Sequence, residues 1–315
     1  MANLNRIWMV DDAWKRISHK ENLEAVGLGH RKYPGYSKKK FIGEIRKLGV
    51  KPHKFIEYSR LPFRGVKFLV LTDNYIKRRF VWLILIARLL NCKVVAVLLE
   101  SPRVKPWVFE NIKKIGSKFD LIVTSDKSTL ETFSRNSVFL NVTGITVPIV
   151  EPNFEERTFL CSYLFNSEKK ITEGHRFRAQ IYETLRGHEF ADQIKIFETS
   201  FGLKKLDTLK DTYYSIVVHN SDDDYYFTDQ ILDCFAAGVV PIHWGSSGYK
   251  KEFDSSGVVN FKTLDDLKTI LSNISINDFR NRIGAIKKNQ MLVSKYKDMD
   301  SELHRVITEK LRIID

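Results

Sequence analysis

The sequence predicts an α/β protein with two parallel-sheet lobes. The chain has 315 residues, a length typical of two domains, and 43% of them are hydrophobic, which is enough for two buried cores. Short apolar runs alternate with helical patterns along most of the chain. The charged segment VPIVEPNFEER, residues 147–157, contains two prolines and interrupts this alternation once.

The apolar runs of the first half are expected to be buried strands. They are residues 6–10, 67–71, 93–99 and 119–124, with helical patterns at 79–90 and 107–115. Continuous apolar strands between helices are typical of a parallel sheet covered on both faces. The stretch FVWLILIARLLNCKVVAVLLE also resembles a membrane span, but Arg88 and Lys93 interrupt it. A spanning helix needs about 20 largely uncharged apolar residues, so a helix followed by a strand is predicted instead.

The same alternation restarts after the break. The expected strands are residues 158–165, 194–198, 213–220, 239–244 and 257–261, and the expected helices are 175–185, one after Thr228 and one from Leu264. We therefore expect two Rossmann-like lobes, residues 1–150 and 151–315, the second with closing C-terminal helices. Parallel sheets bind ligands at the carboxyl ends of their strands, so two facing lobes predict a cleft between them.

Composition narrows the function classes. The three cysteines lie far apart in apolar runs, without zinc spacing, which predicts buried thiols in a reducing compartment. No secretory signal is recognisable at the N-terminus, so we expect a cytoplasmic protein. The net charge of +13 suits nucleic acid, an anionic membrane surface or anionic substrates. Because no nucleic-acid-binding motif accompanies the charge, nucleic acid is not the expected partner.

Several nucleotide-binding and hydrolase motifs do not occur. The sequence has no G-x-G-x-x-G, no P-loop, no G-x-S-x-G and no H-E-x-x-H. These motifs therefore assign no activity, and the function has to be inferred from other residues of the sequence.

Residues 213–253, YYSIVVHNSDDDYYFTDQILDCFAAGVVPIHWGSSGYKKEF, resemble the donor-binding region of the α-1,3-fucosyltransferases. The matching positions are Asn220, Tyr226, Thr228, Pro241 and Gly245. Upstream, residues 159–185 are similar to a second family segment, through Asn166, Arg178, Tyr182 and Leu185. In the first half, LLESPRVKP resembles the family's E-S-P segment and places Glu100 on it.

The resemblance implies an inverting glycosyltransferase of the GT-B type. It would move L-fucose from GDP-fucose onto a hydroxyl of a glycan acceptor. The basic charge and the expected cytoplasmic location favour a surface polysaccharide or a lipid-linked precursor as that acceptor, with peripheral contact at an anionic membrane. The chain has Asp229 and Gln230 where the family has Glu-Lys, and His219 where it has Glu. A different nucleotide sugar is therefore the first alternative, and a non-catalytic scaffold or nucleic-acid-binding protein is the second.

The resemblance also implies roles for the donor-binding residues. Arg178 would bind the diphosphate, because a guanidinium and a helix N-terminus both stabilise phosphate; the alternative is a surface arginine, with Arg176 as a substitute. Independently of the resemblance, Thr228 or Asp229 is expected to cap a helix. Asp229 would also accept hydrogen bonds from sugar hydroxyls, and Gln230 would donate to a phosphate.

Inverting transfer needs a base that takes the proton from the acceptor hydroxyl. Glu100, at the carboxyl end of a predicted strand, is the expected base. Asp73 is the alternative base from a neighbouring strand end, and Asp11 and Asp12 are weaker alternatives.

The triplet Asp222, Asp223 and Asp224 suggests a metal site, since clustered carboxylates bind Mg²⁺ or Mn²⁺. No member of the triplet matches a position of the family pattern, however. We therefore expect no metal and no other cofactor to be required, with the nucleotide sugar as a substrate.

Overall fold

The computed structural model consists of two compact units. One unit comprises residues 1–142 and 300–315, and the other comprises residues 143–299. The structure describes residues 6–10, 56–57, 66–73, 76–77, 81–89, 93–151, 154, 157–166, 172–186, 192–198 and 205–311.

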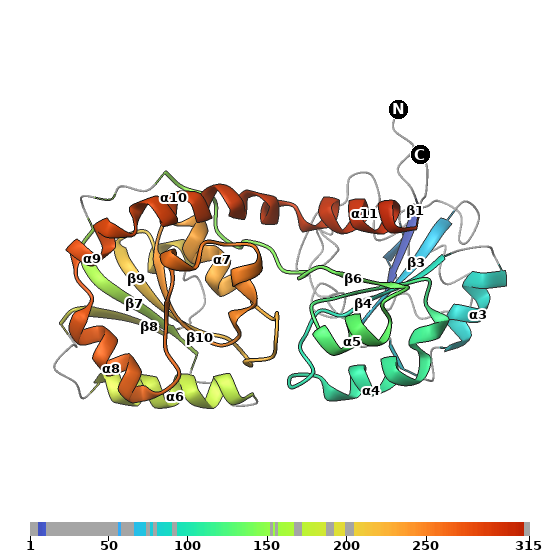
Figure 1. Ribbon diagram of the computed structural model, residues 1–315, viewed down its shortest axis with the longest axis horizontal. Coiled ribbons are helices and arrows are strands. Elements are labelled where there is room, and N and C mark those ends of the chain that lie inside the picture. Colours follow the sequence, from blue (N-terminus) through green and yellow to red (C-terminus); the bar gives the residue numbers. More distant parts are fainter. Residues whose placement is uncertain are drawn as a thin grey trace, which may run out of the picture. The chain divides into compact units, whose positions relative to one another are not determined.

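The described part of the first unit is built on a mostly parallel sheet of order β2-β1-β3-β4-β5-β6 (Figure 1). Its strands are β1 Arg6–Val10, β2 Ile56–Glu57, β3 Val66–Thr72, β4 Lys93–Val97, β5 Leu121–Thr124 and β6 Ser137–Phe139. The short β2 pairs with β1 in the antiparallel sense, and the other neighbours are parallel. The central strand β4 is buried from Val94 to Val97, as its unbroken apolar sequence predicts.

Helices connect these parallel strands. They are α3 Val81–Leu89, α4 Pro106–Ile115, the 3₁₀ turn η4 Gly116–Lys118 and α5 Lys127–Thr132. Pro106 begins α4, where its missing N–H costs nothing, and Asp126 caps α5 by accepting from Thr129 N–H. The predicted division of residues 80–100 into a helix and a strand is confirmed. No helix of the described segments is long and apolar enough to cross a membrane.

The second unit contains a parallel sheet of order β11-β10-β9-β7-β8. Its strands are β7 Phe159–Phe165, β8 Ile194–Glu198, β9 Thr212–Val218, β10 Val240–Trp244 and β11 Val259–Asn260. The chain runs from β7 outward to β8, then returns past β7 to β9 and continues in the opposite direction. Strand order therefore reverses between β7 and β9, which makes this pair the topological switch point.

Helices cover both faces of this sheet, with α6 on one side and α7 on the other (Figure 1). The helices are α6 Glu173–Arg186, α7 Asp229–Ala236, α8 Leu264–Asn273, α9 Ile276–Asn281 and α10 Ile283–Leu292. The 3₁₀ turns are η5 Lys205–Thr208, η6 Ser247–Lys251, η7 Ser255–Gly257 and η8 Val293–Lys297. Apolar residues of α6, α8, α9 and α10 share one buried cluster with the strands.

The unit boundary differs from the expected division at residue 150. The segment from Thr143 onward belongs to the second unit, because its backbone is hydrogen-bonded there. Thr146 N–H donates to the Asp233 carboxylate at 2.6 Å, and Ile145 N–H donates to the Tyr296 carbonyl at 3.1 Å.

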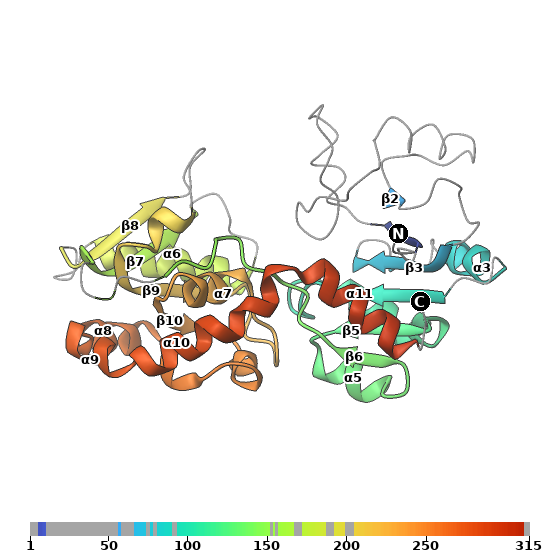
Figure 2. The ribbon, with the colours of Figure 1, turned by 90° about the horizontal axis from the view of Figure 1, so that it is seen from above.

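The C-terminal helix α11, Met299–Lys310, also lies elsewhere than expected. Residues 300–315 belong to the first unit (Figure 2), whereas the sequence pattern assigned all of 151–315 to the second lobe. The physical reason is that Leu303 and Ile307 are buried in the apolar cluster of the first unit. Nothing in the local pattern of this amphipathic helix indicates which core it covers.

Asp233 is the buried carboxylate that fixes residues 143–147 to α7. Its oxygens accept from the Thr146 hydroxyl at 2.6 Å and from Val147 N–H at 3.3 Å, and one pairs with the Lys205 ammonium at 2.5 Å. The Asp233 side chain is 0% exposed and that of Lys205 is 23% exposed. Burial raises the pKa of Asp233, while Lys205 and Thr146 oppose the rise.

Lys205→Met is expected to lower the free energy of unfolding by about 3–5 kcal/mol near neutral pH, because it leaves the Asp233 carboxylate buried without its cation. Removing the lysine raises the pKa of Asp233 further, so the folded variant binds a proton at a higher pH than the wild type does. The stability deficit should therefore shrink as the pH falls through that raised pKa. Urea unfolding at pH 7 and at mildly acidic pH measures both effects.

Lys210→Met is the matched control, because Lys210 pairs with Asp207 on the surface at 3.0 Å. Its removal should leave stability unchanged. Equal deficits in the two variants, or a Lys205→Met deficit that does not change with pH, would contradict the role assigned to the buried pair.

Candidate donor-binding site

The described residues of the predicted donor site gather at the carboxyl ends of the strands of the second unit. Asn166 directly follows β7, Asn220 lies two residues after β9, and Gly245 directly follows β10. Because these strands are parallel and adjacent, their carboxyl ends lie along one sheet edge. This is the edge at which a switch point between β7 and β9 binds ligands.

Arg178 connects helix α6 to that edge. Its guanidinium Nε donates to the Val218 carbonyl at 2.9 Å, and Nη2 donates to the same carbonyl at the end of β9. Nη2 also lies 3.3 Å from Asn220 Oδ1 and 3.5 Å from Gln230 Oε1. The Arg178 guanidinium therefore contacts two other residues that the sequence predicts for the donor site, Asn220 and Gln230.

The guanidinium of Arg178 is buried with neutral partners. The residue is 8% exposed, so the alternative of a surface arginine is wrong. Among the described residues no carboxylate forms an ion pair with it. Burial lowers its pKa, and Tyr163, Tyr226 and Asp229 act in the opposite direction. A buried cation without a counterion is costly, and a bound anion would reduce that cost.

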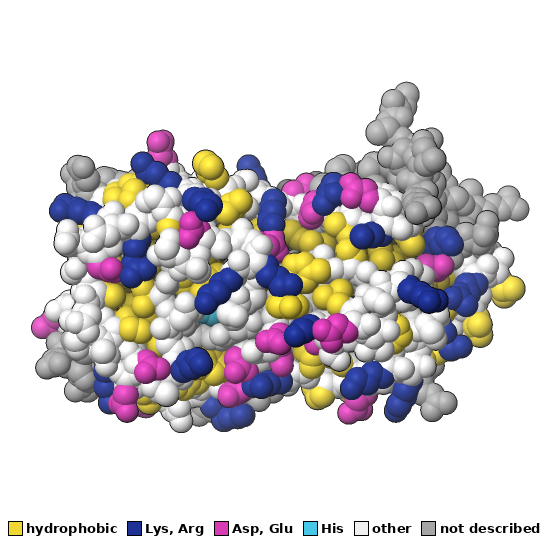
Figure 3. All heavy atoms as spheres, viewed as in Figure 1, with side chains coloured by type: hydrophobic (Ala, Val, Ile, Leu, Met, Phe, Trp, Pro, Cys, Tyr) yellow, Lys and Arg dark blue, Asp and Glu magenta, His cyan; other side chains and the backbone are white. Residues whose placement is uncertain are grey.

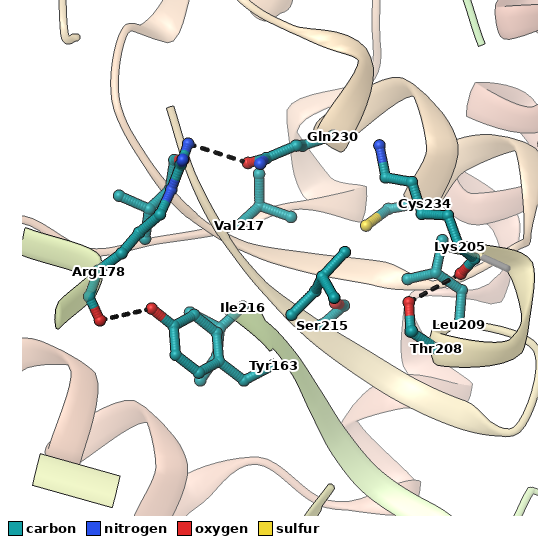
Figure 4. A pocket seen from close by; sticks show the side chains of 12 residues that line it. Tyr163, Arg178, Lys205, Thr208, Leu209, Ser215, Ile216, Val217, Gln230 and Cys234 are labelled. Atoms are coloured by element: carbon teal, nitrogen blue, oxygen red, sulfur yellow. Dashed lines mark hydrogen bonds between the residues drawn. The ribbon is translucent and has the colours of Figure 1, made fainter. Parts of the chain in front are cut away.

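A small pocket lies beside this guanidinium, between the sheet and the start of α7 (Figure 4). Its volume is about 30 Å³, which is enough for water molecules but not for a nucleotide. The pocket is lined from β7 by Tyr163 and Leu164, from β9 by residues 215–218, and by Arg178, Gln230, Cys234, Lys205, Thr208 and Leu209.

Lys205 is a site residue that the sequence analysis missed. Its ammonium pairs with Asp229 at 2.9 Å in addition to Asp233, so it lies at the start of α7 on the side of Gln230 away from Arg178 (Figure 4). Burial acts to lower its pKa, but the two carboxylates outweigh burial and raise it. The available signal was the spacing of Asp229 and Asp233, which places two carboxylates on one helix face and requires a cation beside them.

The start of α7 confirms the predicted cap. Thr228 has extended backbone angles, φ −120° and ψ 173°, and its side chain accepts from Gln230 N–H. Asp229, the first residue of the helix, is engaged by Lys205. Gln230 turns its carbonyl oxygen toward Arg178, an arrangement that a lysine ammonium at this position could not make.

Gly245 is required for close packing against His219. Its φ of +140° is unfavourable for other residues, and an added Cβ would lie 3.0 Å from the His219 Cβ. Tyr226, which is 4% exposed, makes an edge contact with the His219 ring, with ring centroids 6.4 Å apart. His219 thus links two of the predicted donor-site residues.

His219 and His243 form a fully buried pair. The distance from His243 Nε2 to His219 Nδ1 is 3.2 Å, and the other nitrogen of His243 lies 3.1 Å from Asn260 Oδ1. Burial lowers the pKa of His243 to about 4 and that of His219 well below its ordinary value. Both rings are therefore neutral near pH 7. Nε2 of His219 is buried and has no hydrogen-bond partner among the described residues.

The aspartate triplet lies in the loop before Tyr226. Asp222 and Asp224 are exposed, and the Asp223 carbonyl accepts from Tyr226 N–H at 3.1 Å. Within the described segments, no group of three or more His, Cys, Asp or Glu residues is arranged to hold a metal ion. The expectation that no metal is required stays a prediction.

The two candidate bases lie on the first unit. Asp73 directly follows β3, and its side chain is 3% exposed. One of its oxygens accepts from Leu99 N–H at 2.9 Å and the other pairs with Lys105 Nζ at 2.8 Å. Glu100 is half-buried in the loop after β4. Asp11 and Asp12 lie outside the described residues.

Comparison with known proteins supports the fold. No protein-family model matches the sequence, and no curated protein matches it. A crystal structure of an α1,3-fucosyltransferase with GDP has a TM-score of 0.50 and 13% identity, over 88% of this chain and 87% of that chain. A crystal structure of HepE from Anabaena in complex with UDP-glucose has a TM-score of 0.52 and 9% identity, over 79% of each chain.

At these identities the similarity concerns the fold and not the donor. Both units of this chain carry a mainly parallel sheet with connecting helices, as the sequence predicts. The chain has the fold of the GT-B glycosyltransferases, with two Rossmann-like lobes.

Proposed function

We propose that this protein is an inverting glycosyltransferase that moves a sugar from a nucleotide sugar to a hydroxyl of a glycan. The observation that carries the proposal is the buried Arg178 guanidinium, which lies at the switch-point edge without a carboxylate partner. A diphosphate supplies two negative charges in a geometry that a guanidinium binds well. The GT-B fold raises the expectation that the anion is a nucleotide sugar.

The proposed reaction assigns one task to each unit. Glu100 takes the proton from the acceptor hydroxyl while the oxygen forms a bond to the anomeric carbon. The bond between that carbon and the diphosphate breaks, and the diphosphate leaves with the electron pair. Arg178, together with the N-terminus of α7, stabilises the charge that develops on the leaving group. This proposal requires no metal.

L-Fucose from GDP-fucose is the proposed donor, supported by the match of Asn220, Tyr226, Thr228 and Gly245 to the fucosyltransferase pattern. Gln230 in place of the family lysine, together with the fold similarity to a structure in complex with UDP-glucose, favours a UDP-sugar as the second candidate. The proposed acceptor is a surface polysaccharide or a lipid-linked precursor, with the enzyme at a cytoplasmic membrane surface.

The basic charge does not form a single patch on the face shown in Figure 3, where Lys and Arg alternate with Asp and Glu on each unit.

GDP and GDP-fucose are expected to stabilise the protein more than UDP, UDP-glucose, CMP or NAD do, as measured by thermal shift at equal concentrations. A ligand at 100 times its Kd contributes about 2.7 kcal/mol, which such a measurement detects.

Arg178→Gln should weaken nucleotide binding by about 2–5 kcal/mol in titration calorimetry, because the diphosphate loses a desolvated charge partner.

Arg176→Gln is the matched control, because Arg176 lies on the same helix but is exposed. A preference for UDP-glucose would replace fucose with the second candidate. An unchanged nucleotide Kd in Arg178→Gln would show that the diphosphate does not bind at this edge.

Glu100→Gln is expected to lower kcat by about 10²–10⁴-fold with little change in donor Kd, because Gln keeps the shape of the side chain but cannot take a proton. The measurement is release of nucleoside diphosphate in the presence of acceptor, or slow hydrolysis of the donor without one. Glu110→Gln, an exposed change on α4, should have the wild-type rate. A normal rate in Glu100→Gln would exclude Glu100 as the base.

A further inference from the structure

We propose that Asp73 is a positioning residue that fixes the loop carrying Glu100. The inference rests on the proposed function, because it takes Glu100 as the base. The Asp73 carboxylate contacts both ends of the loop: Oδ1 accepts from Leu99 N–H at 2.9 Å, and Oδ2 accepts from Lys105 Nζ at 2.8 Å. Glu100 directly follows the first of these two anchors.

The loop between the anchors is itself a closed turn. Val104 N–H and Lys105 N–H both donate to the Ser101 carbonyl, at 3.1 and 3.0 Å, and Ser101 is 2% exposed. The turn is therefore internally bonded and is fastened at each end to the carboxylate that follows β3. A general base acts only within about 2.6–3.2 Å of the proton it removes, so the backbone that carries it must be well fixed.

The same contacts argue against Asp73 as the base. Both oxygens are already engaged, and its side chain is 3% exposed, so a sugar hydroxyl cannot reach it without breaking the anchors. Glu100 is half-buried and lies on the loop that these anchors hold. The two carboxylates that the sequence offered as alternatives thus have different tasks.

Asp120 provides a matched control at the other end of β4. One of its oxygens accepts from Val94 N–H at 2.8 Å and the other from Lys93 Nζ at 3.4 Å, so it repeats the pattern of a backbone amide and a lysine. It fixes the beginning of β4, whereas Glu100 lies beyond the end of that strand. Asp120→Asn therefore disturbs a similar interaction without releasing the Glu100 loop.

The test is a double-mutant cycle on the full chain. Asp73→Asn is expected to lower kcat by about 10–100-fold with donor Kd within twofold of wild type, while Asp120→Asn keeps the wild-type kcat. In the Glu100→Gln background, Asp73→Asn should change kcat by less than about twofold, because it acts through Glu100. In Asp73→Asn, kcat should still fall at low pH, where the base becomes protonated. In Glu100→Gln, this acid limb of the kcat–pH profile should be lost.

A second change checks the geometry directly. In Asp73→Asn/Lys105→Gln, an amide pair can replace the ion pair, so part of the lost rate should return. Hydrogen exchange of residues 98–105 should be faster in Asp73→Asn and unchanged in Asp120→Asn. If Asp73→Asn does not fold, Lys105→Gln alone should still lower kcat several-fold and speed exchange in this loop.

Three results would overturn the inference: a wild-type rate in Asp73→Asn, additive effects of Asp73→Asn and Glu100→Gln, or loss of the acid limb in Asp73→Asn with Glu100→Gln fully active. The last result would make Asp73 the base. The proposed function fails separately if the wild-type protein binds no nucleotide. The exchange measurement then still decides whether Asp73 holds the loop.

Discussion

The contact of the Arg178 guanidinium with the Val218 carbonyl is the interaction on which the candidate site depends. It ties helix α6 to the carboxyl end of β9 at the point where strand order reverses. Asn220 and Gln230 are held by the same side chain, so the end of β9 and the start of α7 share one cation. Because the hydrogen-bond partners of that cation are neutral, a bound anion would reduce the cost of burying it.

The two units use a similar device to fix irregular segments. In the first unit Asp73 joins Leu99 N–H and Lys105, and in the second Asp233 joins Thr146 N–H and Lys205. A buried carboxylate must have its charge and its lone pairs satisfied, and both residues achieve this with one ammonium and with backbone amides. An irregular segment of each unit is thereby fixed by one buried carboxylate, which follows β3 in the first unit and lies in α7 in the second.

Much of the fold was predictable because its signals are local. Continuous apolar runs indicated β4, β7, β9 and β10, and the polar sequence around Thr228 indicated the start of α7. These features depend on residues within a few positions of each other.

The features that were missed depend on distant residues. Lys205 reaches Asp229 and Asp233 from another segment, and His219 meets His243 across neighbouring strands. The packing of α11 on the first unit also depends on distant residues, because an amphipathic helix covers whichever core the rest of the fold presents to it. A single sequence does not identify the distant partner in such pairings, even where, as at Asp229 and Asp233, the spacing of two carboxylates points to a nearby cation.

The contacts of Gln230 explain why a glutamine fits this position better than a lysine does. A lysine at this position would bring an ammonium close to Arg178, and two cations with no anion between them repel. Gln230 removes that repulsion by accepting from the guanidinium, and Lys205 brings an ammonium to the opposite side of the helix start. That ammonium is balanced by Asp229 and Asp233, whereas Arg178 is not balanced by a carboxylate in the described structure. Among the described residues, Arg178 is therefore the buried cation of this edge that has no ion-paired carboxylate, and under the proposed function the phosphates of the donor would bind to that group.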